Sequence, residues 1–332
     1  MKNVFGTVAG FFALASCLVA AAGENMNGGV WYDDNGYHIN AHGGGILKDG
    51  DVWYWFGEHK ISGDFGNRAF VGVHCYSSEN LVDWTDCGIA LSVTNAVGHD
   101  IEAGCIIERP KVVRNAKTGK YVMYFHLELK DKGYKEARVG IAVADKVAGP
   151  YTFLKSLRPN GYQSRDQTVF VDNDGAAYHF FSSNHNKTMR IIRLSDDYLS
   201  HTDKEAIMAD GDKTEAPAIC FKDGWYFLVG SGCTGWMSNP ARSYRARSIM
   251  GPWERLDNPC KRINPANGLG PERTWGGQST FILKVDDNDY LAMFDEWRPK
   301  NAVDGRYFWV PIKFTDDGKI EIPWKDRVEE RD

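Results

Sequence analysis

Hydrophobic residues of this chain fall in short runs that polar turns separate. Apolar positions rarely recur at the spacing of an amphipathic helix, whereas β-branched and aromatic runs follow one another along the chain. Many of the turns carry Asp-Gly or a related pair, which readily adopts the positive φ angles of tight hairpins. The pattern predicts an all-β fold.

A turn followed by an aromatic-rich strand recurs along the chain as an internal repeat. Its five copies cover residues 49–56, 118–125, 174–181, 223–228 and 287–294. The strand in each copy is apolar on both faces, as expected for an inner strand covered by neighbouring sheets. The spacing of the copies accommodates one four-stranded sheet per repeat, and such sheets can stack around an axis. We therefore predict a five-bladed β-propeller.

The first residues show a different pattern. A short, positively charged start precedes an almost entirely apolar or small stretch over residues 4–19, and three alanines at 20–22 precede Gly23. This pattern is typical of a secretory signal peptide and is too short for a spanning helix. We predict a signal peptide over residues 1–22 and one propeller domain over residues 23–332, with no transmembrane segment in the mature chain.

The export signal has two interpretations, which differ in the fate of Cys17. Residues 14–17 also resemble a bacterial lipoprotein box, but the apolar run continues past Cys17, where a polar tether would normally follow a lipidated cysteine. We favour cleavage after Ala22, which gives a periplasmic or secreted protein. Lipidation of Cys17 would instead give a cell-surface lipoprotein.

The bulk composition limits the possible partners. The chain has 332 residues, of which 43% are apolar and 25% charged, so the disordered and collagen-like classes are excluded. The net charge is −5 and no basic stripe is present, which disfavours a nucleic-acid partner. The many aromatic residues suit sheet packing and sugar-facing clefts equally well. Oligomeric state stays open.

Six cysteines follow the predicted signal peptide, and export would permit disulfides between them. Cys75 and Cys87 flank a strand–turn–strand and could pair, although their spacing alone does not establish it. No cysteine or histidine group has zinc spacing. We therefore expect no metal site and no cofactor.

Short motifs accompany the repeats in a fixed order. They are Asn40–Gly45 with Tyr54–Glu58, Glu108–Val112, Ser164–Asp166, Thr214–Pro217, Gly276–Thr280, Asp295–Pro299 and Arg306–Pro311. In this order the motifs resemble glycoside hydrolase family 43, and most closely its exo-β-1,3-galactanase-like branch. The resemblance spans residues 40–311. It implies an exo-acting, inverting enzyme that releases galactose from a β-1,3-galactan, that is, an oligo- or polysaccharide substrate.

Two glutamates match the catalytic positions of that family. Inverting hydrolysis needs an acid that protonates the leaving oxygen and a group that activates water on the opposite face of the sugar. The resemblance assigns the general acid to Glu215, at the start of the fourth repeat's inner strand. It assigns a second carboxylate, which tunes and orients the acid, to Glu108.

The usual base of the family is absent. Most members carry an Asp at the start of the first inner strand, whereas residues 39–43 contain no carboxylate here. The galactanase-like branch shares this departure, and there a Gln is thought to hold the water; Gln278 matches it. An amide can orient water but accepts a proton badly. His42 is a weaker candidate for the base, and we expect it to be a core or sugar-contacting residue.

The remaining site residues follow from the resemblance. Those expected to contact the terminal sugar are Glu58, Tyr134, Asp166, Asn184 and Thr234. Trp236 and Trp297 could stack on sugar rings, or belong to the core.

Two other functions compete with galactan hydrolysis. The same family contains α-L-arabinofuranosidases and β-xylosidases, but those enzymes normally use the Asp that this chain lacks. A non-catalytic glycan-binding propeller is the alternative of another class, which the missing base favours and the presence of both Glu215 and Gln278 disfavours. Assays on several glycosides would separate these functions.

Overall fold

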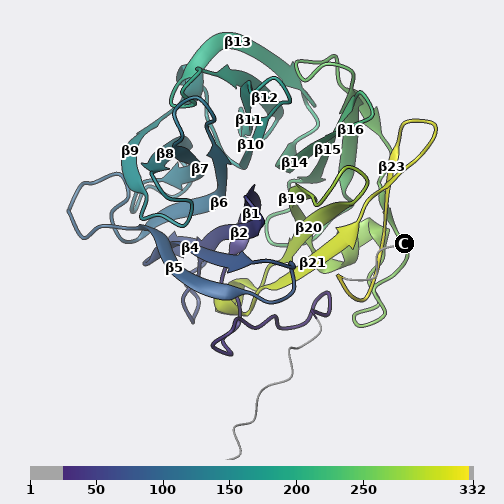
Figure 1. Cartoon of the computed structure of the whole chain (residues 1–332), viewed down its shortest axis with the longest axis horizontal. Coiled ribbons are helices and arrows are strands. Elements are labelled where there is room, and N and C mark those ends of the chain that lie inside the picture. Colours follow the sequence, from purple (N-terminus) through teal and green to yellow (C-terminus); the bar gives the residue numbers. More distant parts are fainter. Residues whose placement is uncertain (1–24, 329–332) are drawn as a thin grey trace, which may run out of the picture.

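A computed structural model of the protein describes residues 25–328. Strands account for nearly all of its regular structure, and the sheets stand around a central axis like the blades of a propeller (Figure 1). The prediction of an all-β propeller is therefore confirmed. The predicted signal peptide (residues 1–22) and Cys17 lie outside the described residues. Between residues 25 and 328, no helix has the length and apolar character to cross a membrane.

Three sheets are regular four-stranded antiparallel blades. They consist of β1 (His42–Asp49), β2 (Val52–His59), β4 (Gly72–Ser78) and β5 (Thr85–Ser92); β10 (Gln167–Val171), β11 (Ala177–Ser183), β12 (Thr188–Leu194) and β13 (His201–Met208); and β14 (Thr214–Lys222), β15 (Trp225–Gly232), β16 (Arg242–Ala246) and β17 (Glu254–Leu256).

The other three sheets depart from that plan. They consist of β3 (Arg68–Ala69), β6 (Cys105–Arg114), β7 (Tyr121–Glu128), β8 (Arg138–Ala144) and β9 (Thr152–Leu157); β19 (Gln278–Lys284), β20 (Tyr290–Glu296) and β21 (Arg306–Pro311); and β18 (Cys260–Lys261), β23 (Ile320–Pro323) and β22 (Lys313–Phe314). Three short 3-10 helices complete the regular elements of residues 25–328: η1 (Pro159–Gly161), η2 (Pro271–Gly276) and η3 (Pro299–Asp304).

The prediction of five blades is wrong, because the strands of residues 25–328 group into six sheets. The five predicted repeats correspond to β2, β7, β11, β15 and β20, one strand in each of five sheets. The sixth sheet joins β18 in parallel to β23, a segment far along the chain, and it contains only short strands. Strands of two to four residues carry no readable repeat, so sequence periodicity could not reveal this blade.

Hydrophobic cores lie between neighbouring sheets. One core packs Phe56 and Val73 of the first blade against Met123 and Phe125 of the next. The small sixth sheet contributes Ile322 to the core that β15 and β20 share. Because each blade is covered on both faces, its inner strands are apolar on both sides, which is the property that the sequence pattern detected.

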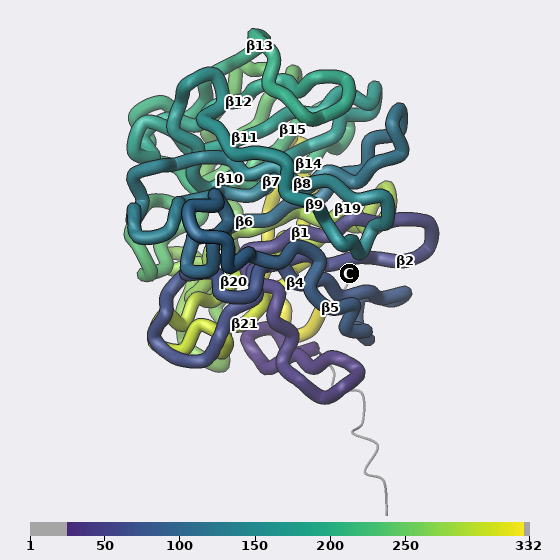
Figure 2. The backbone as a smooth tube through the Cα atoms, turned by 90° about the vertical axis from the view of Figure 1, so that its left-hand side faces the viewer, coloured from purple at the N-terminus to yellow at the C-terminus, as the bar shows by residue number. Residues whose placement is uncertain are grey.

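The N-terminal segment closes the ring. The side-chain amide of Asn27 donates hydrogen bonds to the carbonyl oxygens of Trp309 and Lys325, and the Trp309 amide donates to Asn27 Oδ1. Met26 pairs with Arg327 in an isolated bridge. The side view shows the purple N-terminal segment below β21 (Figure 2). The two ends of the described chain therefore fasten the first and last sheets together.

Candidate active site

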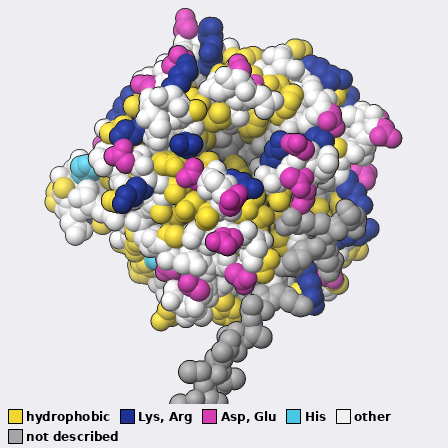
Figure 3. Space-filling view, in the orientation of Figure 1, with side chains coloured by type: hydrophobic (Ala, Val, Ile, Leu, Met, Phe, Trp, Pro, Cys, Tyr) yellow, Lys and Arg dark blue, Asp and Glu magenta, His cyan; other side chains and the backbone are white. Residues whose placement is uncertain are grey.

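The first strands of the blades place their N-terminal ends around one end of the axis. β6, β14 and β19 begin near Glu108, Glu215 and Gln278, and these residues line one cavity of about 320 Å³. The face drawn in Figure 3 is hollowed at its centre. Eight residues predicted for the site line this cavity: Glu58, Glu108, Tyr134, Asp166, Glu215, Trp236, Gln278 and Trp297. Side chains from distant parts of the sequence therefore share one polar pocket.

A β-bulge interrupts four of these first strands close to the cavity. The register shifts after His42 in β1, Glu108 in β6, Glu215 in β14 and Ser279 in β19. A bulge bends a strand and changes the direction of the side chains beside it. The bulges explain how strands that run along the axis can turn carboxyl groups toward the cavity.

Carboxylates of adjacent blades hold three of these bulges in place. Gly43, Arg109 and Ala216 have φ angles of 60°, 56° and 55°, in the left-handed region that costs energy for residues other than glycine. Their backbone amides donate to carboxylates that the preceding blade supplies. The distances are 3.2 Å to Asp295 Oδ2 from Gly43, 3.0 Å to Glu58 Oε1 from Arg109, and 3.0 Å to Asp166 Oδ2 from Ala216. Glu58 and Asp166 therefore also shape the backbone of the site.

Glu215 sits in surroundings that favour a protonated carboxyl group. Gln278 Nε2 donates to its Oε1 over 3.0 Å, and Asn186 Nδ2 donates to its Oε2 over 3.1 Å. Burial and the nearby charge of Asp166 raise the pKa of Glu215 to about 7, although the hydrogen bond with Cys233, the Arg109 charge and the Gln278 hydrogen bond oppose this. A carboxyl group with that pKa still holds its proton near neutral pH, as a general acid must.

Glu108 sits in the opposite kind of surroundings. It accepts hydrogen bonds from His126 Nδ1 over 2.6 Å, from the Tyr134 hydroxyl over 2.5 Å and from the Asn67 amide. Burial alone would raise the pKa of Glu108, but the hydrogen bond and charge of His126 lower it to about 2. Glu108 is therefore a carboxylate at every pH at which the fold is expected to work.

Gln278 is fixed in one orientation by four hydrogen bonds. Its Nε2 donates to Glu215 and to Ser231 Oγ, and its Oε1 accepts from Arg109 and from Trp297 Nε1. Exchanging the amide oxygen and nitrogen would set a donor against both Arg109 and Trp297, so the orientation is determined. Gln278 thus forms a rigid polar wall next to Glu215.

Aromatic side chains form one rim of the cavity. Trp236 and Trp297 meet edge to face with their ring centroids 6.0 Å apart, and Trp236 is 45% exposed. The Arg109 guanidinium lies 5.3 Å from the centre of the Trp297 ring. Neither tryptophan belongs to the buried core, so both remain candidates for stacking on a sugar.

Three predicted residues do not line the cavity. His42 is fully buried and stacks on Tyr307 with ring centroids 5.3 Å apart, and burial lowers its pKa well below the ordinary value. Asn184 lies in the loop that also carries Asn186. The Thr234 hydroxyl donates to the carbonyl oxygen of Met237, within an exposed loop. Their predicted sugar contacts remain predictions.

Several polar residues at the cavity were not foreseen from the sequence. They are Asn67, Arg109, His126, Arg165 and Asn186. Arg109 stood next to a predicted glutamate and could have been inferred from that motif. Asn67 reaches Glu108 only because β3 pairs with β6 and draws its loop onto the next blade. No local feature of the sequence predicts the pairing of β3 with β6.

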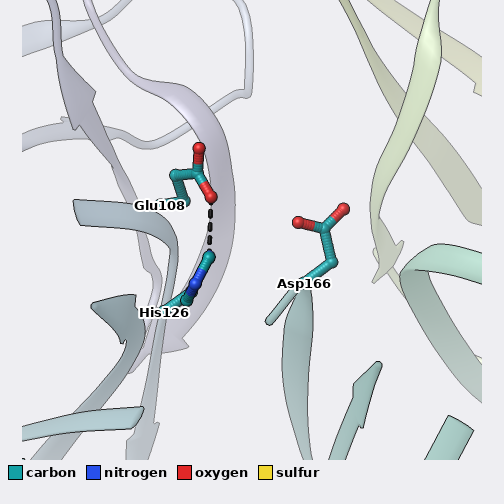
Figure 4. Close-up of side chains that lie close together, drawn as sticks. All are labelled: Glu108, His126 and Asp166. Atoms are coloured by element: carbon teal, nitrogen blue, oxygen red, sulfur yellow. Dashed lines mark hydrogen bonds and ion pairs between the residues drawn. The ribbon is translucent and has the colours of Figure 1, made fainter. Parts of the chain in front are cut away.

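Glu108, His126 and Asp166 approach one another closely enough to suggest a metal site. Each offers a ligand atom, and the three atoms lie within 4.8 Å of one another. Figure 4 shows the hydrogen bond between Glu108 and His126, with Asp166 standing across from this pair and bonded to neither. However, His126 uses Nδ1 for Glu108 and Nε2 for Glu128, so no imidazole lone pair faces the group. The donor set therefore does not fit a cation.

The proposed pairing of Cys75 with Cys87 is not formed. All six cysteines of residues 25–328 are free thiols. The two residues lie on the adjacent strands β4 and β5, where Gly88 is the residue opposite Cys75. The spacing of Cys75 and Cys87 in the sequence therefore reflects their place on adjacent strands and not a disulfide bond.

A family model and several solved structures match the chain. The model of glycosyl hydrolases family 43 matches residues 45–320. A GH43 β-1,3-galactosidase, BT3683, in complex with galactodeoxynojirimycin, is 44% identical, with a TM-score of 0.86 over 91% of this chain and 99% of that one. An exo-β-1,3-galactanase from Phanerochaete chrysosporium with β-1,3-galactotriose is 36% identical, with a TM-score of 0.81 over 91% of this chain and 67% of that one.

A curated relative matches a short stretch of the chain. A short stretch of 66 residues, 20% of this chain, is 44% identical to xylosidase/arabinosidase 43A of Humicola insolens. The chain spans 19% of the length of that curated relative in this match.

Proposed function

Because this chain belongs to glycosyl hydrolases family 43, we propose that it is an exo-acting, inverting hydrolase that releases galactose from β-1,3-galactan. The observation that carries this proposal is one cavity that holds a protonatable Glu215 and an ionised Glu108. The similar solved structures are β-1,3-galactosidases and exo-β-1,3-galactanases, which supports galactose as the sugar.

In this proposal Glu215 protonates the leaving oxygen. Gln278 donates to one carboxyl oxygen and Asn186 to the other, so the carboxyl group of Glu215 is held in place at the cavity. A Glu with a pKa near the working pH is the most effective donor, because it is protonated and yet transfers its proton readily. Aromatic residues at the rim would stack on the apolar face of a galactose ring.

Gln278 would position the attacking water. Both N–H groups and the carbonyl oxygen of Gln278 have protein partners, so the water must replace one of these hydrogen bonds when substrate binds. Positioning of this kind lowers the entropic cost of bringing water and sugar together. The Gln278→Ala variant is expected to lose turnover while retaining substrate affinity; unchanged turnover would remove Gln278 from the mechanism.

A panel of substrates tests the proposed activity. The purified protein is incubated with β-1,3-galactan and with aryl galactoside, arabinofuranoside and xyloside, and products are identified by chromatography. Galactose release that disappears in Glu215→Gln supports the proposal, and NMR of the first anomer tests inversion. Release of arabinose or xylose instead would favour the specificity of the Humicola insolens relative. Glycan binding without any release would favour a binding propeller.

We also propose that the protein is exported, because its start has the pattern of a signal peptide. A polysaccharide is met outside the cell, which agrees with that destination. Fractionation of cells that express the full chain tests the proposal, and a detergent-phase protein that becomes soluble in Cys17→Ser would indicate a lipid anchor. Retention of the uncleaved chain in the cytoplasm would contradict export.

A further inference from the structure

His126 lies between two buried carboxylates at the edge of the cavity. Its Nδ1 is 2.6 Å from Glu108 Oε2, and its Nε2 is 3.0 Å from Glu128 Oε1. His126 is 1% exposed and Glu128 is fully buried. A carboxylate only accepts hydrogen bonds, so both ring nitrogens must carry a proton. The geometry therefore describes an imidazolium cation between two anions.

Glu128 connects this cation to the loop that carries Tyr134. Its Oε2 accepts hydrogen bonds from the backbone amides of Glu136 and Ala137, over 2.8 and 2.9 Å. The Tyr134 hydroxyl donates back to Glu108 Oε1. The contacts form a closed circuit that runs from Glu108 through His126 and Glu128 to the loop and returns to Glu108.

We propose that His126 is a positioning residue that acts through Glu108: as a buried imidazolium it keeps Glu108 ionised and aimed into the cavity, and it ties Glu108 to the Tyr134 loop. The proposal rests on the proposed function, because it assigns Glu108 its charge during hydrolysis. His126 itself holds no free donor or acceptor for a substrate, since both nitrogens are engaged. It therefore acts on the reaction only through its neighbours.

The charges that surround His126 agree with this assignment. Glu108 of β6 and Glu128 of β7, the strand that also carries His126, form ion pairs with it. The centre of the Tyr134 ring lies 5.9 Å from that of the His126 ring, and Asp166, just before β10 of the next blade, is the third acidic group nearby. Lys60 and Arg109 are the nearby cations, and both face other carboxylates. Burial lowers the pKa of a histidine, but the hydrogen bonds that His126 donates to Glu108 and Glu128 raise its pKa to about 9.

Removal of the cation is expected to change the protonation of Glu108. With a neutral residue at position 126, Glu108 would keep its hydrogen bonds from Tyr134 and Asn67 but lose the cation that stabilises its charge, and burial would then favour uptake of a proton by Glu108. Hydrolysis that needs ionised Glu108 would then fail at acid pH first. A role limited to packing would lower activity equally at every pH.

The pH dependence of kcat/KM separates these outcomes. In His126→Gln we expect the acid limb of the profile, which the pKa of Glu108 places near pH 2 in the wild type, to move up by about four units, within the range seen for buried carboxyl groups. The loss of kcat/KM is then about tenfold at pH 5 and much smaller at pH 8. The basic limb of the pH profile, which the pKa of Glu215 sets, should not move. The matched control is His179→Gln, another fully buried histidine that lies away from the cavity; it should keep the wild-type profile. A uniform loss in His126→Gln would overturn the proposal.

A measurement on the unaltered protein keeps the proposal testable if His126→Gln does not fold. Nitrogen-15 NMR of the wild-type protein, with the His126 ring assigned by the shift of its Nε2 signal in Glu128→Gln, should show two ring N–H groups on His126 at pH 7. A neutral ring with one proton at pH 7 would overturn the proposal. This result does not depend on the substrate, so failure of galactan hydrolysis and failure of the imidazolium assignment are distinguishable.

Discussion

Glu108 and Glu215 are the same residue at matching places in two blades, yet their surroundings demand opposite protonation states. Each lies in the N-terminal half of its strand, β6 or β14, precedes a left-handed residue and stands beside a β-bulge. Glu108 faces the imidazolium of His126, and its pKa is lowered to about 2. Glu215 faces amide groups and the charge of Asp166, and its pKa is raised to about 7.

The comparison shows that the side chains around each glutamate determine which of the two is protonated and which is ionised. A charged donor stabilises the ionised carboxyl group, whereas burial and a nearby anion favour the protonated one. Two carboxyl groups whose pKa values are driven apart are the arrangement expected of an acid and its ionised partner. After burial, the charge of Asp166 raises the pKa of Glu215 most, and the tuning and orienting role that the resemblance gave to Glu108 stays a prediction.

The largest effect should come from removing the acid. Glu215→Gln keeps the shape of the side chain but cannot supply a proton, so kcat on galactan should fall about 10³-fold. An aryl galactoside with a strongly acidic leaving group should suffer much less, because that group departs without protonation. The matched control is Glu254→Gln, which replaces an exposed glutamate of β17 and should retain full activity. Equal losses on both substrates would argue against a role as the acid.

Neutralising the ionised partner should have a smaller effect with a different character. Glu108→Gln removes a charged hydrogen-bond acceptor from Tyr134 and His126, and such bonds contribute about 1.5–3 kcal/mol. We expect kcat/KM to fall about 10- to 100-fold on activated and unactivated substrates alike, because proton donation is intact. A loss confined to unactivated substrates would show that Glu108 takes part in proton donation, which would contradict the separate roles of the two glutamates.

The Asp166 charge should set the basic limb of the pH profile. Asp166→Asn retains an oxygen that can accept from the Ala216 amide but removes the charge that helps raise the pKa of Glu215. The pKa that governs the loss of activity at high pH should therefore fall by about one unit, which lowers activity near pH 8 by up to about tenfold. An unmoved basic limb would show that burial alone sets the pKa of Glu215.

The smallest expected effect concerns stability. A carboxyl group with a raised pKa binds its proton more tightly in the folded chain than in the unfolded chain. The free energy of unfolding therefore decreases as pH rises from the unfolded pKa toward 7, and it stays lowered above that. Glu215→Gln lacks this penalty, so its Tm should exceed that of the wild type by a few degrees at pH 8, with little difference at pH 4. A Tm advantage that is equal at both pH values would have another cause.

The sequence predicted the propeller because its inner strands show a local pattern, and the family resemblance predicted most of the cavity residues. Aromatic strands after tight turns identified β2, β7, β11, β15 and β20, and the motifs that resemble the family identified the glutamates. The sixth blade was missed because β18 and β23 pair across a long stretch of chain.

Contacts between blades explain what else the sequence could not provide. Asn67 and Asn186 reach the two glutamates from loops, and the carboxylate of Asp295 supports the bulge at Gly43 from another blade. The sequence separation between such a side chain and the residue that it contacts follows no regular pattern. Family resemblance placed Glu58 and Asp166 at the sugar, but only the structure shows that each also holds a backbone amide.

The most direct test of the contrast between the two glutamates is a titration of their carboxyl groups in the wild-type protein. Carbon-13 NMR of protein labelled at the glutamate carboxyl carbon provides the signals, and Glu108→Gln and Glu215→Gln assign them. We predict that the signal lost in Glu215→Gln titrates near pH 7, while the signal lost in Glu108→Gln remains that of a carboxylate down to the acid limit of the fold. Two signals that both titrate near the ordinary pKa of about 4.3 for Glu would contradict the account.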